Sequence, residues 1–241
     1  MAASPHSRFI AQPSQETEES GRITLRDGTI ANLRPATPND VEALTMFFRG
    51  LSAESLYRRF LSASLPSPDL MTRLTSESDQ RSAFTLVVTR AGPGGIQIIA
   101  TGSYIARDSS TAEVALAVAD SFRGNGLGTL LLERLALLAV RNGFTRFWAI
   151  TSSDNRPMLD VFRESGYEVK EHVSQGGIEI DLAVAPTAAS VDRQELRDRV
   201  ATVASLVPFF RPNAVAVVGA SRDPAGIGHR ILDGLIRAGY R

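Results

Sequence analysis

A glycine-rich segment contains the residues whose types and spacing can do chemistry. It consists of Arg123, Gly124, Asn125, Gly126, Leu127, Gly128 and Thr129. An apolar run from Val114 to Val118 leads into it. Glycine has no Cβ, so a ligand can approach the backbone of such a turn closely. The first amides of a following helix have no partners within the helix and lie at the positive end of its dipole. The segment therefore predicts an anion site, with phosphate as its usual occupant.

The stretch after the glycines is typical of a leucine-rich helix. Its leucines, which recur at helical spacing, are Leu127, Leu130, Leu131, Leu135 and Leu138. Asn142 and Gly143 are a helix stop signal. A turn with a purely structural role is the alternative to a ligand site. Two named phosphate loops are excluded, because the Walker pattern requires a lysine that is absent here and the dinucleotide fingerprint requires a different glycine spacing.

The spacing that fits is Arg-x-x-Gly-x-Gly, from Arg123 to Gly128. It resembles the pyrophosphate-binding signature of the GNAT family of acyl-CoA-dependent N-acyltransferases. Residues 30–40 resemble the first strand and the first helix cap of that family. Residues 154–167 resemble its last helix and the turn beyond it. The resemblance covers residues 22–185, in the order that the family has.

Hydrophobic patterning indicates the elements that must position the glycine-rich segment. The expected elements are a hairpin over 23–34, helices over 41–48, 54–60, 69–74 and 156–164, and strands over 84–89, 96–106, 114–118, 146–151, 168–172 and 178–184. A helix joins the strands at 114–118 and 146–151, so these two are expected to run parallel. The resemblance implies the GNAT fold, of class α/β. In that fold a mixed, mostly antiparallel sheet is flanked by helices, and the parallel pair splays apart.

The composition excludes several classes of function. Lys and Arg total 26, as do Asp and Glu, so there is no electrostatic case for binding nucleic acid or an anionic membrane. No run approaches the ~20 apolar residues that a membrane helix needs. Cysteine is absent, and with three scattered histidines no metal site is expected. Residues 1–20 lack the apolar core of a signal peptide and are expected to be a disordered tail, so the cytoplasm is the default location.

Acetyl-CoA is the cosubstrate that the resemblance implies. Its pantetheine arm would lie between the splayed strands and bind backbone groups of Leu116, Ala117 and Val118. The segment Gly124 to Thr129 would bind the diphosphate, and Arg123 would contact a phosphate, with a surface arginine as the alternative. Asn155 is expected to cap the last helix and to contact the arm.

Glu113 is the candidate catalytic residue. An amine must lose its proton before it attacks a thioester, and for lysine at pH 7 this costs ~4.6 kcal/mol, from a pKa of ~10.4. A positioned carboxylate is therefore valuable. Glu113 matches the position of a glutamate that protein-acylating members of the family have, and an exposed strand-end glutamate is the alternative. Asp120 is the second candidate, favoured as a turn residue.

Two further positions bear on the chemistry. By the resemblance, the Val118 amide faces the thioester carbonyl and can stabilise the charge that develops on it. Phe162 matches a tyrosine that protonates the leaving thiolate in many family members, so no general acid is assigned and water is expected to serve.

Arg58 and Arg59 lie in the second predicted helix. We expect them to form a solvated face, because exposed charge is the norm. In the family this region borders the acceptor site, so a functional role is the alternative.

The end of the chain changes character. Residues 186–212 are predicted to be a linker followed by a charged helix, with Leu196, Val200, Val203 and Leu206 facing inward. Residues 213–241 resemble the opening of the CoA-binding, Rossmann-like domain of NDP-forming acyl-CoA synthetases. About thirty residues make only one βα unit of such a sheet. We therefore expect the domain to be truncated and the chain to belong to a longer fusion protein.

The domains expected are thus a tail at 1–20, an acetyltransferase domain at 21–185, a linker and helix at 186–212, and the start of a second domain at 213–241. The arrangement resembles bacterial protein lysine acetyltransferases that act on acyl-CoA synthetases. We expect direct acetyl transfer to a protein lysine in a ternary complex. The alternatives are a small-molecule amine acetyltransferase and a non-catalytic acyl-CoA sensor.

Overall fold

The structure is a computed structural model. It describes residues 19–25, 27, 29–62, 64–77, 79–92, 94–174 and 176–185, and then 191–192, 195–196, 199–200, 202–203, 206, 210, 215–219 and 222–239. Almost all of the predicted tail and the whole of the segment 186–190 lie outside these residues.

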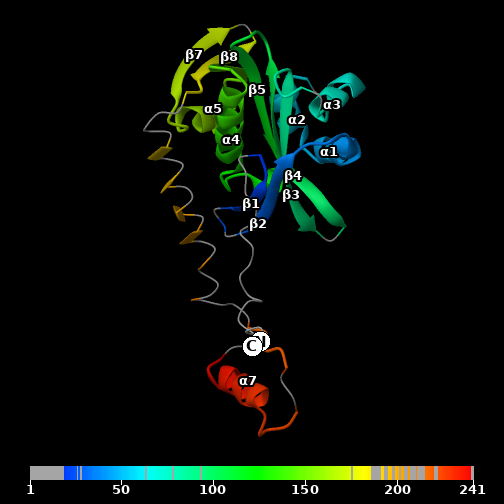
Figure 1. Ribbon diagram of the computed structural model, residues 1–241, viewed down its shortest axis with the longest axis vertical. Helices are drawn as coiled ribbons and strands as arrows, with labels where there is room; N and C mark the ends of the chain where they lie inside the picture. Colours follow the sequence, from blue (N-terminus) through cyan, green and yellow to red (C-terminus); the bar gives the residue numbers. More distant parts are fainter. Residues whose placement is uncertain are drawn as a thin grey trace, which may run out of the picture.

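An eight-stranded sheet organises residues 21–183, with strand order β1-β2-β3-β4-β5-β6-β8-β7 (Figure 1). The strands are β1 Gly21–Thr24, β2 Ile30–Pro35, β3 Ala83–Gly92, β4 Gly95–Ala106, β5 Thr111–Val118, β6 Arg146–Thr151, β7 Glu168–Ser174 and β8 Gly177–Ala183. Every neighbouring pair is antiparallel except β5 and β6, which are parallel. The predicted mixed sheet with one parallel pair is confirmed.

Helices cover both faces of the sheet, as Figure 1 shows. On one face lie α1 Val41–Arg49, α2 Ala53–Phe60 and α3 Pro68–Leu74, and on the other lie α4 Leu127–Arg141 and α5 Arg156–Arg163. Two short 3-10 helices, Pro38–Asp40 and Asp120–Phe122, precede α1 and the glycine-rich segment. Each face has its own apolar core. Leu131, Leu135, Phe147 and Phe162 belong to the α4 side, and Leu44, Phe47 and Phe48 to the α1 side.

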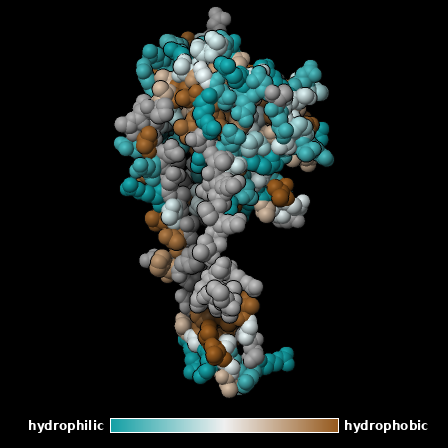
Figure 2. Space-filling model, in the orientation of Figure 1, coloured by the Kyte–Doolittle hydropathy of each residue, from teal (hydrophilic) through white to brown (hydrophobic). Residues whose placement is uncertain are grey.

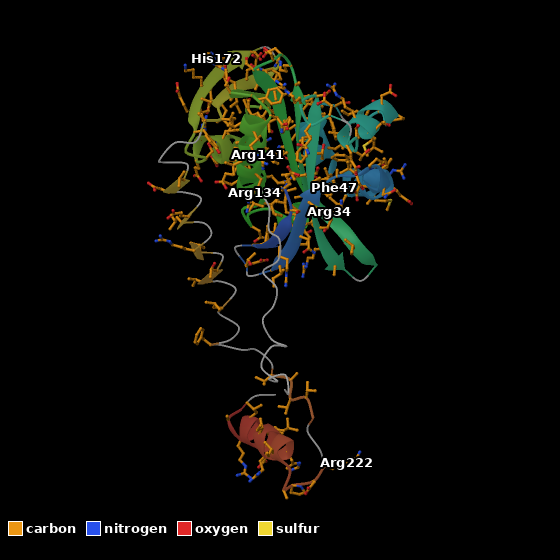
Figure 3. The ribbon with its side chains drawn as sticks, in the orientation of Figure 1. Arg34, Phe47, Arg134, Arg141, His172 and Arg222 are labelled. Carbon is orange, nitrogen blue, oxygen red and sulfur yellow. The ribbon has the colours of Figure 1, made fainter. Side chains whose placement is uncertain are left out.

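An ion pair fixes the passage from β2 into α1. The guanidinium of Arg34 donates to both carboxylate oxygens of Asp40, at 2.7 and 2.6 Å. The amide of Thr37 donates to the same carboxylate at 2.8 Å. Hydrogen bonding from Arg34, opposed by burial, lowers the pKa of Asp40 to about 2. Figure 3 labels Arg34 at this junction.

The C-terminal region differs from the expectation. Leu196, Val200, Val203 and Leu206 are 63%, 47%, 64% and 45% exposed, so the predicted inward packing of these side chains is wrong. Residues 215–217 are not part of a strand, and α7, Ile227–Arg237, has no buried residue. Figure 2 shows hydrophobic side chains gathered over this C-terminal region, in contrast with the mostly polar surface above it. That residues 213–241 begin a Rossmann-like domain stays a prediction.

Among the described residues, no helix is both long and apolar enough to cross a membrane.

Candidate active site

A cavity of about 490 Å³ lies where four elements meet. The glycine-rich segment, the end of β5, one face of α2 and the start of α5 form its walls. Six residues of the glycine-rich segment line it, namely Arg123, Gly124, Gly126, Leu127, Gly128 and Thr129. Leu116, Ala117, Val118 and Asn155 line it as well. The structure therefore gathers into one cavity every predicted cosubstrate residue except Asn125, which lies in the loop but not in the cavity wall.

Two glycines give the loop its shape. Gly124 and Gly126 have φ angles of 79° and 82°, in the left-handed region that other residues avoid. Gly126 stands at the N-cap of α4, where no side chain caps the helix and the first turn contains no acidic residue. The amides of that first turn consequently remain available to an anion.

The edge of β5 that faces β6 is open at the cavity. The parallel pairing runs from Thr111 opposite Arg146 to Glu113 opposite Trp148 and ends there. Residues 116–118, which come later on β5, pair with Gly102, Thr101 and Ala100 of β4 on their other side. Backbone groups of this stretch can therefore bind an extended ligand that enters between β5 and β6.

Asp120 connects the loop to α2. Its carboxylate accepts hydrogen bonds from the Ser55 hydroxyl at 2.6 Å and from the Ser52 amide at 2.9 Å, and it pairs with Arg123 at 2.9 Å. Arg123 also donates to the Ser55 hydroxyl. Burial raises the pKa of Asp120, but these hydrogen bonds and the charge of Arg123 outweigh burial and lower it overall. The turn role predicted for Asp120 is confirmed, because it begins the 3-10 helix before the loop.

The prediction that Arg58 and Arg59 are solvated is wrong. Both line the cavity, and the Nε atom of each is buried. The Arg58 side chain is 17% exposed, and its guanidinium pairs with Glu54 at 2.5 Å and lies 3.7 Å from Asp154. Arg59 donates to the hydroxyl of Ser103 at 3.1 Å. Spacing of three and four residues places both arginines on the same helix face as Ser55.

Glu113 lies outside the cavity wall, on β5 before the open stretch. It is exposed and stands between Ile105 of β4 and Trp148 of β6. The guanidinium of Arg107 lies over the Trp148 ring, 3.8 Å from its centroid. Glu113 shares a sheet face with Ala115 and Ala117 because side chains on a strand alternate.

Two expectations about α5 need correction or completion. Asn155 stands at the N-cap but makes no side-chain capping bond. Its side-chain amide instead donates to the hydroxyl of Thr151, the last residue of β6, at 2.8 Å, and Asn155 is buried there. Phe162 is 2% exposed in the α4-side core and does not line the cavity.

Sequence reasoning missed Ser55 as a site residue and placed the two arginines in solvent. The available signal was the shared helix face of Ser55, Arg58 and Arg59, since helical spacing puts all three on one side. The spacing does not give the direction of that face, which depends on how α2 packs against β5 and reaches Ser103 of β4.

Comparison with known proteins bears on this geometry. The sequence profile of the acetyltransferase (GNAT) family matches residues 52–167. Acetyltransferase Pat from Mycolicibacterium smegmatis is 32% identical over 68% of this chain and 50% of its own length. Acetyltransferase PA5475 from Pseudomonas aeruginosa is 31% identical over 68% of this chain and 87% of its own length. The chain thus spans about half the length of the mycobacterial relative.

A solved structure has the same architecture. The crystal structure of the GNAT domain of S. lividans PAT superposes with a TM-score of 0.61 at 31% identity, covering 68% of this chain and 96% of that one. A structure of yncA from Salmonella typhimurium with acetyl-CoA, at 20% identity and a TM-score of 0.51, shares the fold. The chain therefore belongs to the acetyltransferase (GNAT) family of N-acetyltransferases, whose cosubstrate is acetyl-CoA.

Proposed function

We propose that this chain transfers the acetyl group of acetyl-CoA directly to a lysine side chain of a protein, in the cytoplasm, with acyl-CoA synthetases as its targets. The observation that carries the proposal is the single cavity that joins the uncapped start of α4 to the open edge of β5. A diphosphate fits the first part and an extended arm fits the second.

The cosubstrate would be held by backbone groups for the most part. The amides of Gly126, Leu127 and Gly128 bind the diphosphate, since they stand at the positive end of a helix that no side chain caps. Arg123 adds a charged donor at the same place. The open backbone of residues 116–118 binds the pantetheine arm as an added strand would. Asn155 lines the arm's path from the α5 side.

Glu113 acts as the general base. The attacking amine nitrogen forms a bond to the thioester carbon, the carbon–sulfur bond breaks with its electron pair leaving on sulfur, and the amine proton passes to Glu113. The Leu116 amide, in the part of the open stretch nearest Glu113, stabilises the negative charge on the carbonyl oxygen. Val118, the donor expected from the resemblance, lies five residues beyond Glu113, ~16 Å along the strand and on the diphosphate side. Water protonates the departing thiolate, because Phe162 has no proton to donate and lies in the core.

An accessible sheet face beside Glu113 favours a protein acceptor. Alternate residues of β6 and β8 are buried, namely Phe147, Ala149, Ile180 and Leu182, while Trp148 and Ile150 on the opposite face remain partly exposed. Glu113 stands next to Trp148 on this open face. A folded partner can therefore present a lysine there. The preference for synthetases rests on the resemblance of residues 213–241 to a synthetase domain, and on relatives named acetyltransferase Pat and PAT.

The test is acetylation of purified acyl-CoA synthetases by this chain with acetyl-CoA, read by mass spectrometry of modified lysines. A panel of small amines is assayed in parallel. Acetyl-lysine on a synthetase, with slower turnover of every small amine, supports the proposal. Turnover of a small amine alone favours the small-molecule enzyme, and tight CoA binding without any transfer favours a sensor.

Glu113→Gln tests the base. We expect kcat to fall about 100-fold, the usual worth of a general base, while CoA affinity measured by calorimetry stays unchanged. Glu179→Gln is the matched control, since Glu179 lies on the same sheet face, on β8 opposite Ile150. Turnover by Glu113→Gln equal to that of the wild type would remove Glu113 from the mechanism.

A further inference from the structure

Three arginines line the cavity, and they differ in how their charge is balanced. Arg123 pairs with Asp120 at 2.9 Å, and Arg58 pairs with Glu54 at 2.5 Å. No carboxylate of the described residues lies within ion-pair distance of Arg59. Its Nη2 donates to Ser103, and its Nε is buried without a hydrogen-bond partner among those residues.

A guanidinium has five N–H donors in a fixed planar fork, which matches a carboxylate. Leaving a buried charged donor unpaired is costly, and such an arrangement persists in a binding site when the ligand supplies the partner. The Phe60 ring supports the guanidinium from one side, 4.8 Å from its centroid. Burial lowers the pKa of Arg59 to about 10, with the charge of Glu113 opposing this shift, so Arg59 remains a cation at neutral pH.

The position of Arg59 along the cavity identifies which part of a ligand it meets. Ser55, one helical turn earlier on α2, lies at Asp120 and therefore at the diphosphate end. Arg59 lies over Ser103, which pairs with Ala115 of β5. In that direction the cavity wall includes residues 116–118 of the open stretch but no earlier residue of β5, so Arg59 lies at the end of the arm's path away from the diphosphate. Arg59 therefore stands at the acyl end.

We propose that Arg59 is the seat for a carboxylate at the far end of the acyl group, so that this enzyme also uses acyl-CoA donors derived from dicarboxylic acids, such as succinyl-CoA. This inference rests on the proposed placement of the CoA arm. Transfer follows the chemistry already given: the amine nitrogen replaces sulfur on the thioester carbon, and the distal carboxylate stays unchanged.

A carboxylate on the acceptor is the competing occupant. It is disfavoured because Arg59 lines the same cavity as residues 116–118, whereas Glu113, which faces the acceptor, does not. Glu113 repels any carboxylate bound nearby, but it is exposed and solvent screens its charge. A pair between the buried Arg59 guanidinium and a bound carboxylate is screened much less, so this attraction is expected to exceed the repulsion from Glu113.

The test compares succinyl-CoA with butyryl-CoA, which has an acyl chain of equal length without the charge. For the wild type we expect succinyl-CoA to bind about tenfold more tightly by calorimetry, the size of one hydrogen bond to a charged group, and to have the higher kcat/KM with a protein acceptor. Arg59→Met should bring the succinyl-to-butyryl ratio to 1 or below, and Arg59→Lys should restore it in part. Arg58→Met is the control, because Arg58 already pairs with Glu54, and it should leave the succinyl-to-butyryl ratio as in the wild type.

Each other outcome overturns the inference. A succinyl-to-butyryl ratio at or below 1 in the wild type excludes a carboxylate site at Arg59. This comparison does not depend on the folding of any variant. A ratio that persists in Arg59→Met shows that another group reads the carboxylate, and a change confined to the KM of the acceptor assigns Arg59 to the acceptor. If acetyl-CoA is used but succinyl-CoA is not, only this inference fails. If no acyl-CoA is bound, the proposed function fails with it.

Discussion

The carboxylate of Asp120 accepts a hydrogen bond from the hydroxyl of Ser55 at 2.6 Å, across 65 positions of sequence. This contact ties the turn before the glycine-rich loop to α2, which covers the opposite side of the cavity. The loop therefore does not depend on its glycines alone for its position. Arg123 joins the same cluster, because it contacts both Asp120 and Ser55.

Removing the Ser55 hydroxyl should loosen this connection. For Ser55→Ala we expect the Kd for CoA to rise about three- to tenfold, the worth of one typical intramolecular hydrogen bond. Isothermal titration with CoA measures it. Ser64→Ala, an exposed serine of the following loop, is the control and should bind CoA as the wild type does. An unchanged Kd in Ser55→Ala would show that the loop holds its place without α2.

Gly126 requires a left-handed backbone, with φ at 82°. Alanine there should lower the free energy of unfolding by about 1–2 kcal/mol, since a Cβ clashes in this region. Urea unfolding measures the loss. Gly50→Ala is a matched control, because Gly50 ends α1 with an ordinary φ of −80° and its Cβ would meet only normal contacts at 3.5 Å. Equal stabilities of the two variants would contradict the strain argument.

Gly102 lies on β4, directly opposite Leu116 of β5, the strand with the open edge. A Cβ at this position would come within 2.9 Å of the Leu116 side chain and 3.0 Å of that of Leu135. Gly102→Ala should therefore cost about 1–3 kcal/mol through overpacking. Combining it with Leu116→Ala removes the nearer of these contacts, so the double variant should lose less stability than the sum of the two single losses. Strict additivity in chemical denaturation would exclude this contact as the cause.

The stability of the β2–α1 junction should depend on acidic pH. Arg34 lowers the pKa of Asp40 to about 2, below its ordinary value of 3.8. The carboxylate's contribution is therefore fully present above its unfolded pKa and is lost as the pH falls from about 4 towards 2. We expect Asp40→Asn to lower the free energy of unfolding at pH 7 by about 2 kcal/mol, from a shift near two pKa units. The gap between variant and wild type should close as the pH approaches 2.

Asp69→Asn serves as the control for that titration. Asp69 is an exposed carboxylate in the first turn of α3, with no ion pair among the described residues. Its substitution should change stability by less than about 0.5 kcal/mol, as at most surface sites. A gap for Asp40→Asn that stays constant from pH 7 to pH 2 would exclude the ion pair as its source.

Local patterning was sufficient for most of the fold. Strand alternation and the leucine spacing of α4 located the elements, and the helix between β5 and β6 required the two strands to be parallel. The glycine spacing from Gly124 to Gly128 indicated the left-handed turn before α4, because few other residues adopt such a turn. Each of these patterns spans only a few neighbouring residues, so a single sequence is enough to detect it.

The rest depends on contacts between distant segments. Arg59 meets Ser103 and Asp120 meets Ser55 only after α2 has packed across the sheet. Asparagine is a common N-cap residue, yet the side-chain amide of Asn155 donates to Thr151, four residues earlier and at the end of β6. The apolar side chains from Leu196 to Leu206 have helical spacing, but spacing does not say what covers them.

Only three residue pairs join β5 to β6, whereas β3 and β4 share ten. The sheet therefore consists of two well-paired parts, β1 to β5 and β6 to β8, that are joined by a short parallel pairing. This pairing ends where the cavity begins. A cosubstrate that hydrogen-bonds along the free edge of β5 would connect the two parts of the sheet beyond this pairing. Filling the cavity should therefore stiffen the whole sheet, including the face beside Glu113 that we propose for the acceptor.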